Sequence, residues 1–182
     1  IEYFEKQKIY VASGNAKASK GNFSLQADNI TAFMGKTNNS GIMYIEATGN
    51  VIIIDQDTIA KSNFAKYNFK EKIIILKGNT PSIEAKAFTL KSKKFISFDD
   101  IQKIATGEGD VKLVLSGPIS IFSKRINAKF DKINNNLISA SAQGNVRIET
   151  KSEIITCNSA KYNTKTNLIS LEDNVIIKRD KS

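Results

Sequence analysis

The segment Ala47-Thr-Gly-Asn-Val-Ile-Ile has a near copy at Ala142-Gln-Gly-Asn-Val-Arg-Ile, and this pair decides the fold class. A shift of 95 residues superimposes the two segments, and over residues 47–79 it gives fifteen identities in thirty-three positions. Chance would give roughly three in a chain this rich in Lys, Ile and Asn. The sequence therefore contains a tandem duplication of a 95-residue unit.

A Gly-Asn pair, or a close variant of it, recurs along the whole chain with spacings of 35, 29, 31, 35 and 29 residues. Both residue types tolerate a positive φ, so each pair predicts a corner or a tight turn. The series indicates one domain over residues 1–182, with repeat halves at about 10–100 and 105–180. The pairs are Gly14-Asn15, Gly49-Asn50, Gly78-Asn79, Gly109-Asp110, Gly144-Asn145 and Asp173-Asn174.

Polar clusters between the apolar runs predict further turns. Residues 38–41 (Asn-Asn-Ser-Gly) and 134–136 (three asparagines) lie about 95 residues apart and mark one pair of turns. Residues 69–72 and 164–167 mark a second pair with the same separation. Together with the Gly-Asn pairs, these turns divide the chain into about fifteen short antiparallel strands.

The local pattern is that of strands rather than helices, because apolar and other residues alternate with period two. Val51-Ile-Ile-Ile could face either way, but its copy Val146-Arg-Ile-Glu places charge at the second and fourth positions. Val51 and Ile53 should therefore point inward. The same argument predicts one inner wall, made of Val51, Ile53, Ile74, Leu76, Val111, Leu113, Leu115, Val146, Ile148, Ile169, Leu171 and Val175, with Ile177 after them.

Composition excludes several kinds of chemistry. The chain has 182 residues, a formal net charge of +9, no histidine and one cysteine, Cys157. Without histidine there is no catalytic triad with an imidazole base and no mixed Cys/His zinc site. We expect no catalytic residue, no metal site and no cofactor, and we expect Cys157 to be passive. Nucleic acid is not an expected partner, because the positive charge is dispersed and no stacking-aromatic motif is present.

The element Ala-x-Gly-Asn-Val-x-Ile is followed in both halves by Ile-x-x-x-x-x-Ala-x-Tyr, at residues 59–67 and 154–162. This arrangement resembles the OstA/LptA family of periplasmic lipopolysaccharide-transport proteins, over roughly residues 8–179. The amino-terminal domain of LptD and the protein LptC share the architecture. The sequence departs from the pattern at Gly109-Asp110, at Asp173-Asn174 and at Thr80-Pro81, where a proline replaces a strand residue.

The resemblance implies a slightly open β-jellyroll whose apolar interior receives the acyl chains of lipid A, with the predicted inner wall as the lining of the groove. It implies a non-enzymatic periplasmic carrier that bridges the inner and outer membranes and meets other Lpt components at both. Head-to-tail homo-oligomers would form through the edge strands, for which residues 9–18 and 173–179 are the candidates.

Two other interpretations remain open. The chain could be a membrane-tethered, LptC-like component of the same export machinery. It could also be a structural or adhesive β-repeat protein with a dry core and no lipid ligand, because inward Val, Ile and Leu residues form the core of almost any β protein.

Overall fold

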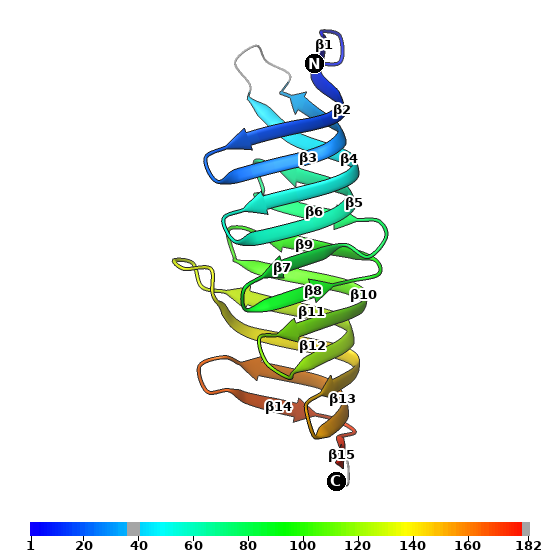
Figure 1. The fold of residues 1–182 in the computed structure, drawn as a ribbon, viewed down its shortest axis with the longest axis vertical. Helices are drawn as coiled ribbons and strands as arrows, with labels where there is room; N and C mark the ends of the chain where they lie inside the picture. The colour runs from blue at the N-terminus through cyan, green and yellow to red at the C-terminus, as the bar shows by residue number, and fades with distance from the viewer. Residues whose placement is uncertain (36–40, 180–182) are drawn as a thin grey trace.

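The computed structural model describes residues 1–35 and 41–179, and within this part of the chain every regular element is a β-strand (Figure 1). The prediction of an all-β fold with about fifteen strands is confirmed. The described strands are β1 (Glu2–Phe4), β2 (Ile9–Lys20), β3 (Phe23–Met34), β4 (Ile42–Asp55), β5 (Thr58–Asn68), β6 (Ile73–Lys77), β7 (Ser82–Ala85), β8 (Phe88–Lys91), β9 (Phe95–Asp99), β10 (Ile104–Leu115), β11 (Ser120–Phe130), β12 (Leu137–Glu149), β13 (Glu153–Asn163), β14 (Leu168–Glu172) and β15 (Ile176–Arg179).

These strands form one antiparallel sheet, in which most strands pair with their neighbours in sequence. The order is β1-β2-β3-β4-β5-β6-β9-β10-β11-β12-β13-β14, while β7 and β8 form a hairpin between β5 and β10, and β15 pairs with β13. Eight of the strands are longer than expected. β2 to β5 and β10 to β13 have 11 to 14 residues each.

The long strands arise because Gly-Asn is a bulge inside a strand and not a turn between two strands. In β4, Gly49 and Asn50 have φ angles of 74° and 47°. The register shifts between Thr48 and Val51 relative to β5 and between Thr48 and Ile52 relative to β3, so β4 carries one extra residue there. Such a bulge bends a strand without ending it. Gly14, Gly109 and Gly144 produce the same bend in β2, β10 and β12.

At two of the six Gly-Asn positions, which we call corners, one strand ends and another begins. The Gly78-Asn79 copy separates β6 from β7, and Pro81, which has no backbone N–H for a ladder bond, follows it closely. The Asp173-Asn174 copy separates β14 from β15, and both of its residues have positive φ angles. These are two of the sites at which the sequence departs from the repeated pattern.

The corners divide the sheet into two facing arms. Arm A contains β6, β9 and β14, and arm B contains β7, β8 and β15; each long strand contributes one segment to each arm. Thus the first part of β10 pairs with β9 and its last four residues pair with β8. Phe88 in arm B contacts Phe130 in arm A, so the free ends of the arms meet along an edge opposite the corners, which we call the seam.

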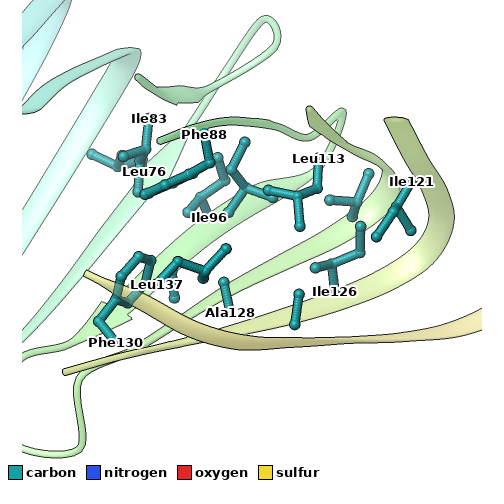
Figure 2. Packing of buried hydrophobic residues seen from close by; sticks show 14 of the residues in the cluster. Leu76, Ile83, Phe88, Ile96, Leu113, Ile121, Ile126, Ala128, Phe130 and Leu137 are labelled. Atoms are coloured by element: carbon teal, nitrogen blue, oxygen red, sulfur yellow. The ribbon is translucent and has the colours of Figure 1, made fainter. Parts of the chain in front are cut away.

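The core lies between the arms (Figure 2). Ile83, Phe88 and Leu113 extend from arm B toward Ile126 and Phe130 of arm A. The side chains with no solvent-exposed surface include Leu90, Leu113, Ile126 and Ile148. Because fully buried aliphatic side chains contribute about 1.5–3 kcal/mol each, this layer supplies much of the driving force for folding.

The duplication is visible in the order of the elements. β12, β13 and β14 begin 95 residues after β4, β5 and β6. The predicted turns at 69–72 and 164–167 connect equivalent strands, and they are capped alike. The Oδ1 atom of Asn68 accepts hydrogen bonds from two turn amides, and that of Asn163 does the same. Residues 134–136 lie between β11 and β12. Residues 38–40 of the equivalent predicted turn lie outside the described residues.

Candidate functional site

The predicted inner wall coincides closely with the observed core. Eight of its residues are buried, namely Val51, Ile53, Leu76, Val111, Leu113, Leu115, Val146 and Ile148. Ile74, Ile169 and Leu171 are partly buried against the same cluster. These eleven residues come from the two halves of the duplication and from both arms.

Val175 lies outside the packed core. Its side chain is 44% exposed, and it precedes the four-residue strand β15, which pairs with β13. Ile177 pairs with the buried Ile155 in arm B and faces the same way, but its side chain is 51% exposed. No further strand covers this end of arm B within the described part of the chain, so the inner face is accessible there.

Strand register aligns the inward residues into continuous apolar rows. In arm A one row contains Ala12, Ile30, Ala47, Ala65, Leu76, Ile96, Gly107, Ile126, Ala142, Ala160 and Leu171. In arm B the facing row contains Ala18, Leu25, Ile53, Ala60, Ile83, Leu90, Leu113, Ile121, Ile148, Ile155 and Ile177. Neither row contains a polar side chain, so an apolar path extends from β2 to the last strand of each arm.

An aromatic cluster closes the seam near the middle of the molecule. The ring centroid of Phe130 lies 5.2 Å from that of Phe88 and 6.0 Å from that of Phe98. Phe88 and Phe130 are buried. The contact joins the arms through side chains alone, whereas the opposite edge is a continuous backbone at the corners. The seam is therefore the weaker of the two edges.

The interior is more open toward the amino-terminal end. Tyr10 is 43% exposed, and its ring lies 4.6 Å from that of Tyr3, its cross-strand partner. Phe23 and Met43 are also exposed. Phe23 shares its face of β3 with the buried Leu25, so it marks the seam edge of arm B in this half. Accessible apolar surface thus lies at both ends of a packed centre.

Sequence reasoning missed Ile83, Phe88 and Leu90, which are buried in arm B. A shift of 95 residues takes Phe88 and Leu90 beyond the end of the sequence and places Ile83 on Lys178, so no second apolar copy could show which residues face inward. The alternation Ile83, Ala85 and Phe88, Leu90 was the available signal, but each run has only four residues.

The titratable groups have structural roles. Burial raises the pKa of the Cys157 thiol, and its sulfur donates to the Ser159 carbonyl at 3.2 Å. Asp99 accepts hydrogen bonds from two turn amides, and Asp100 pairs with Lys103 at 2.6 Å. No group of His, Cys, Asp or Glu suited to a metal ion is found in residues 1–35 and 41–179.

Comparison with known proteins identifies the family to which the chain is similar. Residues 1–96 match the family model described as LptA/(LptD N-terminal domain) LPS transport protein. The chain belongs to this family. The matched residues contain almost all of the first repeat half, and the family consists of lipopolysaccharide-transport proteins. The predicted OstA/LptA-like resemblance is confirmed.

A solved structure shows the same fold. It is LptH, the LptA-homologous periplasmic component of the lipopolysaccharide transport device from Pseudomonas aeruginosa. The match has a TM-score of 0.52 and 12% sequence identity, and it covers 86% of this chain and 93% of LptH. A search of curated protein sequences gives no match. The described part of this chain contains no helix with the length and hydropathy needed to cross a bilayer.

Proposed function

We propose that this LptA/LptD family protein carries lipopolysaccharide by enclosing the lipid A acyl chains between arms A and B, without catalysing a reaction. The observation that carries the proposal is the pair of facing apolar rows, which extend across successive strands without a polar side chain. Burying one methylene contributes about 0.8 kcal/mol, so an acyl chain of about twelve carbons gains roughly 10 kcal/mol in such surroundings.

Entry of an acyl chain requires separation of the arms, because the centre between them is packed. The corners hold the arms together covalently, so the seam is the edge that opens. Opening would separate the ring of Phe88 in arm B from the rings of Phe98 and Phe130 in arm A, and the acyl chain would then pack against the apolar faces that these rings cover. Since the rows offer interchangeable aliphatic side chains and no buried polar anchor, a lipid bound there would also be free to move along them.

The two ends of the sheet support a bridging role in the periplasm. At the amino-terminal end, β1 covers only residues 9–11 of β2, so the predicted edge at residues 9–18 is shortened by this pairing. At the carboxy-terminal end, β15 has all four residues exposed. Free backbone groups at such edges can pair with a second copy or with another Lpt component. Head-to-tail contacts of this kind would join the apolar rows of successive molecules.

Photo-crosslinking tests the proposal. A photoreactive side chain at Ile53, Ile148 or Ile177 should capture lipopolysaccharide, whereas one at Arg147 should not. Arg147 lies between two inward residues of β12 and points outward, so it is a matched control in the same strand. Position 177 is already accessible and avoids disturbing the core. Equal labelling at inward and outward positions would contradict the lining, and no labelling anywhere would favour a structural protein.

A further inference from the structure

The outer face of arm A carries a depression of about 520 Å³ over β6, β9, β10, β11, β12 and β13. This volume lies within the usual range of ligand sites, about 300–1,000 Å³. Ten of the twelve lining residues are polar or charged, among them Ser97, Thr106, Asn127, Ser139 and Ser141, and the other two are Ile73 and Ile104. The depression is on the opposite side of the sheet from the apolar rows, so acyl-chain binding does not use it.

The two copies of the duplicated unit differ on this outer face. In the first half, the equivalent face is filled by Phe33 and Tyr44, whose stacked rings lie 4.2 Å apart. Their counterparts by cross-strand pairing are Lys129 and Ser139. Replacing two stacked rings by a serine and a flexible lysine leaves this part of the outer face unfilled.

The two halves also differ in the ion pairing of an equivalent lysine, Lys66 in the first half and Lys161 in the second. In the first half, Lys66 pairs with Glu46 at 3.0 Å and lies 4.0 Å from the Tyr44 ring centre. The equivalent residues of the second half are Lys161 and Ser141, which face each other across β12 and β13. Within residues 1–35 and 41–179, no acidic group forms an ion pair with Lys161.

The charge balance of the depression is positive. Arg125, Lys129 and Lys161 line it, and Asp99 is its one acidic lining residue among those described. The Oδ1 atom of Asp99 already accepts the amides of Ile101 and Gln102. Arg125 is only loosely paired with Glu108, at 3.6 Å. Three cations around a floor of hydroxyl and amide groups favour a ligand that is both anionic and rich in hydroxyl groups.

We propose that this depression binds an acidic oligosaccharide, whose phosphate or carboxylate groups contact the cations and whose hydroxyl groups contact the polar floor. A nucleic acid fits less well, because the described lining residues include no aromatic side chain for base stacking. The acidic sugar could be the glycan part of a bound lipopolysaccharide or a separate acidic glycan. The proposal does not depend on acyl-chain binding between the arms.

Titration of the full chain with three probes tests the proposal. The probes are an acyl-free, phosphorylated core oligosaccharide released from lipopolysaccharide, tri-galacturonate, and neutral maltotriose. Both acidic probes, or one of them, should shift the amide signals of β11 to β13, and binding should weaken with added salt. Binding of the core oligosaccharide alone identifies the cargo as the source, and binding of tri-galacturonate alone identifies a separate glycan.

The double variant Ser139→Tyr/Ser141→Glu should weaken binding by about tenfold or more, because it places one of the two rings of the first half in the depression and gives Lys161 an acidic partner. That half shows that the fold accommodates both side chains. Lys161→Gln should also weaken binding, whereas Lys66→Gln, at the equivalent paired lysine, should not. The proposal is overturned if neither acidic probe binds, if maltotriose binds equally well, or if the double variant binds like the wild type. Photo-crosslinking of lipopolysaccharide at Ile53 is a separate measurement, and its outcome does not depend on any of these results.

Discussion

The rings of Phe88 and Phe130 are in contact, with centroids 5.2 Å apart, although they belong to opposite arms of one sheet. Phe88 lies beside Leu115 at the end of arm B, and Phe130 lies beside Leu137 at the end of arm A. Their contact closes the seam at the middle of the molecule. Opening the arms requires breaking it.

Phe88→Ala should lower the free energy of unfolding by about 3–5 kcal/mol, because the ring is buried and its removal leaves a cavity. It should also accelerate lipid uptake by loosening the seam. Phe23→Ala is the matched control, since Phe23 also lies on the inner side of arm B but is 39% exposed. Phe23→Ala should lower the free energy of unfolding by only about 1 kcal/mol. Urea unfolding and the rate of lipid capture measure both effects, and equal costs would contradict the packed centre.

Gly49→Ala should destabilise the protein more than Gly14→Ala, although both glycines have a positive φ. At Gly14 an added methyl group meets nothing within 4 Å, so the cost is the backbone strain alone, about 1 kcal/mol. At Gly49 the methyl group would approach the Asp28 Cβ to 2.9 Å, which adds about 1–3 kcal/mol. Thermal unfolding of the two variants gives the comparison. Similar losses of thermal stability in the two variants would mean that the structure around Gly49 can shift to make room for the methyl group.

Stability at alkaline pH should depend on Tyr67. Burial, and to a lesser degree the nearby Asp100 carboxylate, raises the pKa of Tyr67. The unfolded chain therefore ionises this phenol first, so the fold loses stability as the pH rises above about 10 and through the folded pKa. Tyr67→Phe should reduce this loss. Unfolding midpoints between about pH 7 and pH 11 measure it, and identical slopes for the two proteins would exclude the contribution of this phenol.

Deleting residues 173–182 should reduce concentration-dependent self-association while leaving the fold intact. The deleted segment includes β15, whose side chains are all exposed and which pairs with β13 at the end of arm B. Ile133→Ser provides a control, because Ile133 is an isoleucine that is 94% exposed in a loop away from both sheet ends. Sedimentation velocity should show weaker association for the deletion only. Unchanged sedimentation would remove the last strand from the interface.

The sequence allowed the inner face to be predicted where two copies could be compared. Arg147 and Glu149 showed that Ile52 and Ile54 point outward, although the first copy is apolar at all four positions. The segment with Phe88 and Leu90 has no such copy, and its four-residue strands are too short for periodicity to decide. The exposure of Val175 was not predictable, because alternation gives the facing direction of a residue but not whether anything covers it.

The corners were predicted as positions of positive φ but not as bulges. Gly and Asn favour the same backbone region in a turn and in a bulge, so only the continued pairing of Val51 with Ser62 distinguishes the two. The outer depression depends on which strands are neighbours. Lys161 and Ser141 are 20 positions apart in sequence and meet only through strand pairing.

The duplicated unit also sets a fixed increment of length. In arm A, β4 and β12 are separated by six strand positions, which corresponds to about 29 Å at the usual spacing of roughly 4.8 Å between strands. Both copies bend at the equivalent glycines Gly49 and Gly144 and share inward residues such as Val51/Val146 and Ile53/Ile148, so a longer array of units extends the same kind of interior. Addition or loss of one unit would therefore change the distance that a single chain can reach without altering what fits inside it.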